Sequence, residues 1–192
     1  MGEDGGVTRI VAGTAGGRRL KVPPKGTRPT SERVREALFN ALETAGELDG
    51  SRVLDLYAGS GALGLEALSR GASDALFVEA DRRAVDVLRG NIASLRLGGT
   101  VRAGQVEAVV AAPAPQAFDL VLADPPYDVG AAVLSKVLAA LADGGWLGEG
   151  ALVVVERAAR DGEPDWPPGF APARAKKYGD TAVYWAEYRV VA

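Results

Sequence analysis

Residues 53–64, VLDLYAGSGALG, join a short apolar run to a glycine-rich turn and to the first residues of a second apolar segment. The run before the turn has the length of a buried strand, and the segment after it continues with helical spacing. Gly59, Gly61 and Gly64 fit the pattern G-x-G-x-x-G, in which glycine permits a tight turn and lets a ligand lie against bare backbone. This stretch predicts the first strand–turn–helix unit of an α/β sheet with a ligand site at its edge.

The sequence around this unit alternates between short apolar runs and longer segments of helical periodicity. We expect strands at Arg52–Leu56, Ala75–Glu79, Thr100–Ala103, Phe118–Ala123 and Ala151–Glu156, and helices at Ala62–Arg70, Arg82–Leu95, Val106–Ala112 and Val129–Ala142. Such alternation predicts parallel strands joined by right-handed crossovers in a doubly wound, Rossmann-like α/β sheet.

The C-terminal part departs from this alternation. Arg174–Lys177 and Ala182–Arg189 flank the turn-forming residues 178–181. We therefore expect an antiparallel hairpin that completes a seven-stranded, mostly parallel sheet. Arg160–Ala173 is rich in Pro and Gly and predicts a surface loop.

A basic segment precedes the sheet. Arg9–Ala12 and Arg18–Val22 predict a small β-hairpin, and Thr30 or Ser31 is expected to cap a following helix. Residues 7–40 contain eight basic and two acidic residues, whereas the whole chain has a net charge of −3. A basic extension on an acidic body is typical of a protein that binds a phosphate backbone, and a solvated basic face without a partner is the alternative.

The composition bounds the possible chemistry and the number of domains. We expect two parts, a basic extension over residues 1–45 and the sheet domain over residues 46–192. The chain has no cysteine and no histidine, which excludes disulfides, thiolate chemistry, histidine bases and histidine-ligated metals. Carboxylates, Tyr, Lys, Arg or a cofactor must therefore carry any reaction. No apolar run reaches the length of a membrane span and no signal peptide is visible, so we expect a soluble, cytoplasmic protein.

A second motif, Asp124-Pro125-Pro126-Tyr127, directly follows the expected strand Phe118–Ala123. Open α/β sheets bind their ligands at the carboxyl ends of their strands. A carboxylate and fixed carbonyls can accept both protons of an exocyclic amino group, while an aromatic ring stacks on the base. The motif thus indicates a site that grips a nucleobase, and a proline-rich turn without function is the alternative.

Acidic residues near the glycine turn indicate which cofactor is bound. Glu79 ends the next strand and can take both hydroxyls of a ribose, although a solvated strand end also explains a single acid there. Asp55 and Asp124 would flank the cleft with negative charge, which suits the sulfonium of S-adenosylmethionine better than the pyrophosphate of a nicotinamide dinucleotide. Glu107 could border the adenine or lie on a short solvated helix. The candidate cofactor residues are Asp55, Tyr57, Ala58, Gly59, Gly61, Gly64, Glu79, Ala80 and Glu107.

Together these motifs resemble those of the class I S-adenosylmethionine-dependent methyltransferases that modify exocyclic amino nitrogens. Within that class, residues 28–40 (RPTSERVREALFN), 9–13 (RIVAG) and 177–181 (KYGDT) resemble the RsmD family, from about residue 8 to the end of the chain. The resemblance implies methylation of the N2 atom of one guanine in small-subunit (16S) ribosomal RNA, in the 30S subunit or its assembly intermediate. It implies a monomer without a metal, in which Asp124, Pro125, Pro126 and Tyr127 hold the guanine.

The resemblance also implies that the basic extension recognises RNA. The residues expected to contact phosphates are Arg9, Arg18, Arg19, Lys21, Arg28, Arg33 and Arg35. Arg33 and Arg35 could instead pair with Glu32, Glu36 or the acidic rim of the sheet. The alternative functions are a DNA methyltransferase acting on adenine N6 or cytosine N4, a non-catalytic RNA-binding module, and a nicotinamide oxidoreductase.

Overall fold

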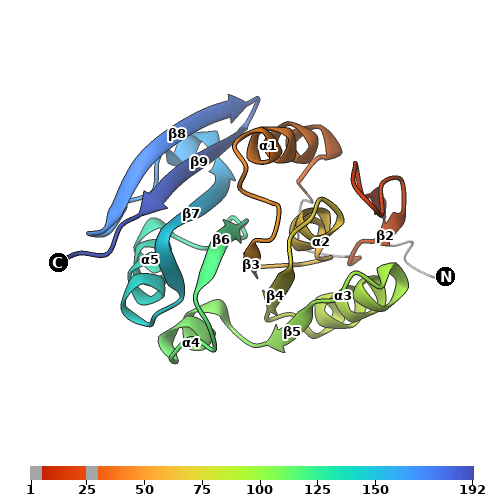
Figure 1. Ribbon diagram of the computed structural model, residues 1–192, viewed down its shortest axis with the longest axis horizontal. Coiled ribbons are helices and arrows are strands. Elements are labelled where there is room, and N and C mark those ends of the chain that lie inside the picture. Colours follow the sequence, from red (N-terminus) through yellow and green to blue (C-terminus); the bar gives the residue numbers. More distant parts are fainter. Residues whose placement is uncertain (1–5, 25–29) are drawn as a thin grey trace.

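A seven-stranded sheet organises the structure, a computed structural model that describes residues 6–24 and 30–192 (Figure 1). Its strands are β3 (Arg52–Leu56), β4 (Asp74–Glu79), β5 (Thr100–Ala103), β6 (Phe118–Ala123), β7 (Leu147–Ala158), β8 (Phe170–Tyr178) and β9 (Thr181–Tyr188). The strand order is β5-β4-β3-β6-β7-β9-β8, with β3 to β7 parallel and β9 antiparallel to both of its neighbours. The predicted doubly wound sheet with an antiparallel C-terminal hairpin is confirmed.

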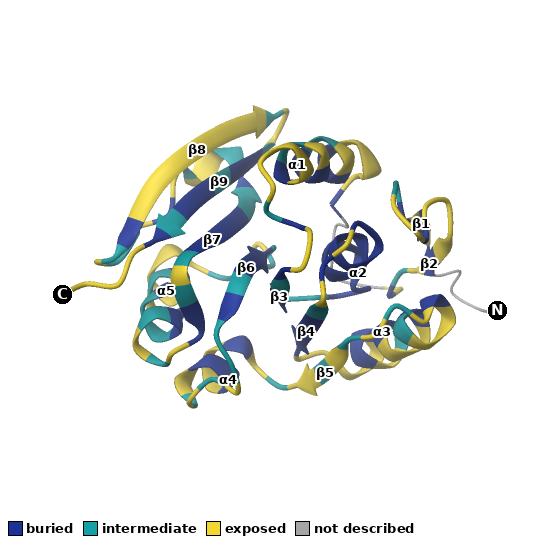
Figure 2. Ribbon diagram, viewed as in Figure 1, coloured by how far each residue is buried: buried dark blue, intermediate teal, exposed yellow. Residues whose placement is uncertain are grey.

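Helices cover both faces of the sheet (Figure 1). One layer consists of α1 (Glu32–Thr44), α2 (Ala62–Ser69) and α3 (Arg82–Leu95), and the other of α4 (Val106–Ala111) and α5 (Ala131–Asp143). Successive strand residues point to opposite faces, so Val53 packs with the first layer and Leu54 with the second. The central strands are accordingly buried on both sides (Figure 2). No helix in the described parts of the chain is long and apolar enough to cross a membrane.

The N-terminal extension shares the core of the sheet domain. It forms a hairpin of β1 (Val7–Arg9) and β2 (Arg19–Lys21), followed by α1. Ile10, Leu20 and Leu38 belong to the same buried apolar cluster as Val53 of β3. The hairpin is therefore packed against the sheet domain through a continuous hydrophobic core.

The first strand, β1, ends at Arg9 and not at Ala12 as the sequence predicts. The backbone at the expected end of the strand is hydrogen-bonded to a buried carboxylate. The backbone N–H groups of Val11 and Ala12 donate to the two carboxylate oxygens of Glu66 on α2, at 2.8 and 3.1 Å. These groups are thus bound to a side chain instead of a neighbouring strand. Ser31, and not Thr30, caps α1: its hydroxyl accepts from the N–H of Val34 at 3.2 Å.

Part of the expected C-terminal loop is a strand. The segment 160–173 was predicted as loop throughout, but β8 begins at Phe170, after a short 3₁₀ turn at Ala159–Asp161 (η1) and an irregular stretch. Phe170 is opposite Tyr188 in the β8–β9 register and the two rings lie 5.5 Å apart. This aromatic contact extends the hairpin in spite of the prolines nearby, because the packing energy of two rings outweighs local propensity.

Arg35 does not lie on the RNA-facing surface predicted for it. Its side chain is 0% exposed, and its Nε lies 3.4 Å from Glu66, whose other oxygen is 3.0 Å from Nε of Arg70. Arg35 also donates to the carbonyl of Arg9. A buried guanidinium cannot contact an RNA phosphate, so that prediction is wrong for Arg35. Arg35 is in an ion pair, as the alternative expected, but its partner is the buried Glu66 of α2 and not Glu32, Glu36 or the rim of the sheet.

We expect Glu66→Gln to lower the free energy of unfolding by about 3–5 kcal/mol, because removing one partner leaves buried charges uncompensated. Urea denaturation followed by circular dichroism measures the change. Glu43→Gln is the matched control, since Glu43 pairs with the same Arg70 but is 60% exposed. Glu43→Gln should lower the free energy of unfolding by less than about 1 kcal/mol. Equal stability of the two variants would contradict a central role for the Glu66 carboxylate.

Candidate active site

The strand order reverses between β3 and β6, and a cavity opens at that point. The chain runs outward from β3 to β5 and then returns to place β6 beside β3. Leu56 is paired with Ala123, so Tyr57 and Asp124 are the next residues of the two strands. The cavity has a volume of about 340 Å³, within the range of small-molecule sites, and is lined by Tyr57–Ser60 and by Asp124–Tyr127. The structure thus brings the two sequence motifs together in one cleft.

The three glycines of the turn have different physical roles. Gly61 has a φ of 84°, and a Cβ there would lie 2.4 Å from Leu88. At Gly64 a Cβ would lie 2.4 Å from the ring of Phe77, so this glycine allows α2 to approach the sheet. Gly59 has a φ of 55°, and nothing lies within 4 Å of a Cβ built on it. Only Gly59, which lines the cavity, offers bare backbone to a ligand.

Two buried carboxylates, Asp55 and Glu79, accept hydrogen bonds from the backbone of the glycine turn. Asp55 Oδ2 accepts from the N–H of Gly64 at 2.9 Å. Glu79 Oε1 accepts from the N–H of Gly59 at 2.8 Å, and its Oε2 accepts from Asp81 at 2.8 Å. Glu79 therefore braces the loop that faces the cavity. Each oxygen keeps a second lone pair for a further donor such as a ribose hydroxyl.

Unsatisfied polar atoms lie beside the turn. Burial raises the pKa of Asp55 to about 8, with the Gly64 N–H opposing the shift and the charge of Glu79 adding to it. Burial also raises the pKa of Tyr57, and the charge of Glu107 adds to that rise. Among the described residues, neither Asp55 Oδ1 nor the Tyr57 hydroxyl has a hydrogen-bond partner. Buried polar atoms without partners are costly, so this edge suits a polar ligand.

The remaining predicted cofactor residues lie outside the cavity lining. Ala80 and Glu107 are exposed, the first after β4 and the second in the first turn of α4. Gly61 and Gly64 belong to the turn, and Asp55 and Glu79 accept hydrogen bonds from its backbone, but none of the four lines the cavity.

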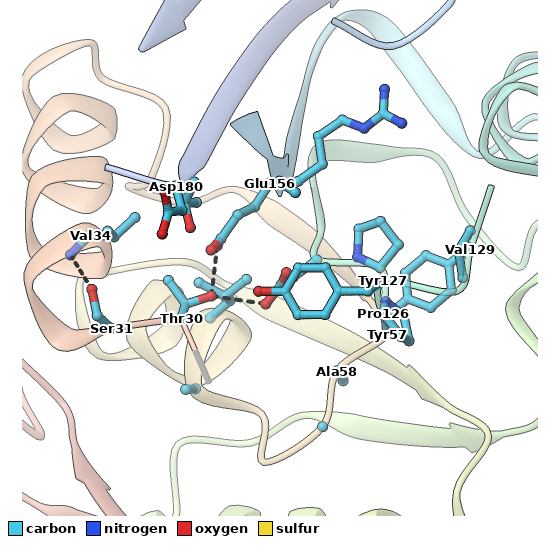
Figure 3. A pocket seen from close by; sticks show the side chains of 18 of the residues that line it. Thr30, Ser31, Val34, Tyr57, Ala58, Pro126, Tyr127, Val129, Glu156 and Asp180 are labelled. Atoms are coloured by element: carbon cyan, nitrogen blue, oxygen red, sulfur yellow. Dashed lines mark hydrogen bonds between the residues drawn. The ribbon is translucent and has the colours of Figure 1, made fainter. Parts of the chain in front are cut away.

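Thr30 lines the cavity, and its hydroxyl lies close to two carboxyl groups, one of them that of Glu156 (Figure 3). Its Oγ1 lies 2.9 Å from Asp124 Oδ2 and 2.7 Å from Glu156 Oε2. Burial raises the pKa of Asp124 well above its ordinary value, the neighbouring charge of Glu156 adds to the rise, and the Thr30 hydrogen bond opposes it.

The cavity lining includes residues that the sequence did not single out for the site. Besides the predicted Tyr127, which is 61% exposed, it contains residues 178–181 of the β8–β9 turn and Arg157. A signal existed for Glu156, because it is the last residue of a strand expected to lie parallel to the strand before Asp124. No local pattern indicated Thr30, which reaches the cavity from the extension.

Most of the basic residues that were predicted to contact RNA are exposed on the extension. Arg9, Arg19 and Lys21 are exposed on the hairpin, and Arg9 lies directly opposite Arg19 in the β1–β2 register. Arg18 is exposed and donates to the carbonyl of Ser94 at 3.0 Å. Arg33 is exposed on α1, and Arg28 lies outside the described residues. Val22 and Pro23, directly after β2, line the cavity.

The raised pKa of Asp55 predicts a pH-dependent stability. The neutral form dominates in the folded protein up to about pH 8, whereas the unfolded chain ionises near 3.8. The free energy of unfolding should therefore fall as the pH rises from about 4 to about 8. Asp55→Asn mimics the neutral form and should flatten this fall in urea titrations at several pH values. An unchanged pH profile in the variant would show that Asp55 is ionised in the folded state.

Comparisons with known proteins agree with this architecture. The family model described as "Conserved hypothetical protein 95" matches residues 8–187. The chain is 39% identical over 178 residues to "Ribosomal RNA small subunit methyltransferase D" of Escherichia coli strain K12, covering 92% of this chain and 88% of the relative. It is 33% identical over 180 residues to "Putative rRNA methyltransferase YlbH" of Bacillus subtilis strain 168, covering 91% and 96%.

A solved structure is similar over almost the same length. "Putative methyltransferase yhhF from Escherichia coli" matches with a TM-score of 0.87 and 36% identity, covering 97% of this chain and 100% of that one. The chain therefore belongs to the conserved hypothetical protein 95 family, the RsmD family of methyltransferases whose motifs its sequence resembles.

Proposed function

We propose that the protein transfers a methyl group from S-adenosylmethionine to the N2 atom of one guanine in small-subunit ribosomal RNA. The substrate is the 30S subunit or its assembly intermediate in the cytoplasm. The observation that carries this proposal is the single cavity lined by both the glycine turn and Asp124-Pro125-Pro126-Tyr127. The name of the 39% identical Escherichia coli relative supports the choice of ribosomal RNA.

The residues around the glycine turn suit S-adenosylmethionine. The bare backbone of Gly59 and the unpaired atoms of Asp55 and Tyr57 offer contacts to a polar ligand beside the turn. Glu79 is the candidate residue to accept hydrogen bonds from the ribose hydroxyls of the cofactor. When bound, S-adenosylmethionine supplies an electrophilic methyl carbon on a sulfonium, a cation that suits a cleft lined by Asp124, Glu156 and Asp180.

Asp124 prepares the amino group for attack. The lone pair of the guanine N2 atom is delocalised into the ring, which makes it a poor nucleophile. A carboxylate and the carbonyl of Pro125 accept the two amino protons and favour a pyramidal nitrogen. As the N–C bond forms and the S–C bond breaks, positive charge develops on nitrogen, and a fixed carboxylate stabilises it. The surplus proton then passes to Asp124 or to water, and the raised pKa of Asp124 makes it a competent acceptor.

The prolines and Tyr127 position the base. Pro125 and Pro126 restrict the backbone, so their carbonyls keep fixed directions. Tyr127 presents an exposed ring at the rim, where a flipped or unpaired base can stack on it. Alignment of two bound reactants supplies much of the remaining acceleration.

The repulsion between two arginines on the hairpin supports the proposal that this hairpin binds RNA. Like charges directly opposite one another destabilise an antiparallel pair, yet Arg9 and Arg19 occupy such positions and both are exposed. A phosphate between the two side chains would relieve this repulsion. The hairpin leads through Val22 and Pro23 into the cavity, so RNA held there lies next to the proposed site.

Asp124→Ala should lower kcat for methyl transfer to 30S particles by at least about a hundredfold, because the amino group loses its charged acceptor. Transfer of labelled methyl groups, followed by nucleoside analysis, measures the rate and identifies the product as N2-methylguanosine. Calorimetry should show that affinity for S-adenosylmethionine is largely kept. Asp128→Ala removes an exposed carboxylate four residues away and is the control. Near-normal turnover by Asp124→Ala would refute its assigned role.

Replacing both Arg9 and Arg19 by Gln should weaken RNA binding and flatten its salt dependence. Loss of two phosphate contacts reduces the slope of log K against log salt by about 1.4–1.8. Filter binding to 30S particles at several salt concentrations measures this slope. The control replaces Arg102 and Lys136 by Gln, two exposed cations on β5 and α5 away from the hairpin. If both double variants gave the same slope of log K against log salt, the hypothesis that the hairpin contacts RNA would be rejected.

A further inference from the structure

A second cavity adjoins the first at Tyr127 and at the β8–β9 turn. It has a volume of about 520 Å³ and is lined by residues 158–160, Lys177, Gly179, Asp180 and Tyr127. Tyr127 and Asp180 belong to the lining of both cavities (Figure 3). A ligand that stacks on Tyr127 in the first cavity can therefore extend into the second.

The two cavities differ in charge. Among the described residues, those lining the second cavity include two cations, Arg160 and Lys177, and one carboxylate, that of Asp180. The lining of the first cavity includes one cation, Arg157, and the carboxyl groups of Asp124, Glu156, Asp161 and Asp180. Because like charges repel, an anion is favoured in the second cavity over the first.

The fold brings the two cations together from separate segments. Lys177 lies near the end of β8, where it is paired with Ala182 of β9. Arg160 lies in η1, directly after β7. The N–H of Ala159 donates to the carbonyl of Asp180 at 2.7 Å, which ties η1 to the β8–β9 turn. This backbone hydrogen bond holds the segments that carry Arg160 and Lys177 on one cavity.

Arg160 and Lys177 keep their donors for a ligand. Neither forms an ion pair, a side-chain hydrogen bond or a ring contact with another residue in the described parts of the chain. The other cations of β8 differ, because Arg174 lies 5.0 Å from the ring centre of Trp185 and Lys176 lies 5.1 Å from that of Tyr178. Side chains alternate along a strand, so Arg174 and Lys176 point to the opposite face from Lys177.

We propose that the second cavity binds a backbone phosphate of the RNA next to the target guanosine. A base stacked on Tyr127 is joined through its sugar to a phosphate on each side, and the carboxylates of the first cavity disfavour a phosphate there. Arg160 and Lys177 can donate charge-assisted hydrogen bonds to phosphate oxygens in the cavity that Tyr127 also lines. Such a contact fixes the position of the nucleotide without reading its base.

This inference rests on the proposed function and adds to it a second RNA contact, independent of the β1–β2 hairpin. A general attraction of RNA to the basic β8–β9 hairpin makes a different prediction from a phosphate site. General attraction depends on the total charge, whereas a site depends on which face of β8 loses its cations. The variant Arg160→Gln/Lys177→Gln tests the cavity, and Arg174→Gln/Lys176→Gln is the matched control with the same change in charge.

The first measurement compares the two double variants on 30S particles. We expect Arg160→Gln/Lys177→Gln to lower kcat/KM for methyl transfer by about tenfold or more, mainly by raising KM, because the cations bind the RNA and not the reacting atoms. Loss of one phosphate contact should reduce the slope of log K against log salt by about 0.7–0.9 in filter binding. The control variant should change both values less. Calorimetry with S-adenosylmethionine and circular dichroism verify that each variant is folded and binds its cofactor.

The second measurement identifies the phosphate. In 30S particles, a neutral methylphosphonate replaces in turn the phosphate on each side of the target guanosine. One of these replacements should lower kcat/KM of the unmodified protein by about tenfold, because the cations lose their charged partner. The same replacement should change kcat/KM of Arg160→Gln/Lys177→Gln by less than about twofold, since the contact is already absent there.

The outcomes distinguish this inference from the proposed function. Equal effects of the two double variants, or losses from the methylphosphonate that are as large in the cavity variant as in the unmodified protein, overturn the phosphate site while the proposed function stands. If the unmodified protein binds 30S particles but transfers no methyl group to guanine, the proposed function is rejected, and the phosphate site beside a target guanosine with it.

Discussion

Buried carboxylates that bind backbone N–H groups are the interaction on which the cavity depends. A carboxylate withdrawn from water is costly unless its oxygens accept hydrogen bonds, so each one constrains the loop that satisfies it. Asp55, Glu66 and Glu79 all lie on core elements and are all buried. Their backbone partners are Gly64 for Asp55, Val11 and Ala12 for Glu66, and Gly59 and Asp81 for Glu79. The glycine turn beside the cavity and the loop after β1 are thus held by buried side chains of the core.

The same principle connects the extension to the cavity. Glu66 stands on the helix that follows the glycine turn, yet it binds the backbone of the N-terminal hairpin and the guanidinium of Arg35. Thr30, at the other end of the extension, meets Asp124 in the cavity. The segment that presents the exposed basic residues therefore also completes the site. A partner bound to the hairpin would lie on a surface rigidly tied to the cleft, because the two share one hydrophobic core.

The role of a basic residue in the extension depends on its burial as well as on its charge. Its basic residues look equivalent in the sequence, but Arg35 is buried beside Glu66 whereas Arg9 and Arg19 are exposed and face each other across the hairpin. The first arrangement neutralises charge within the protein, and the second leaves charge for a partner. Of these three, only the exposed pair can meet a phosphate, since phosphates reach only the surface.

The sequence by itself determined the order of strands and helices, the glycine turn and the motif at Asp124, because these follow from local periodicity and from short-range backbone chemistry. It also predicted that Asp55 and Asp124 flank one cleft, since ligand sites of open α/β sheets lie where the strand order reverses. Tertiary structure alone decided that Glu79 braces Gly59, that Arg35 is buried and that Thr30 and Glu156 join Asp124. Those contacts link residues 20 to 126 positions apart, and they arise from packing and strand register, which no local stretch of sequence encodes.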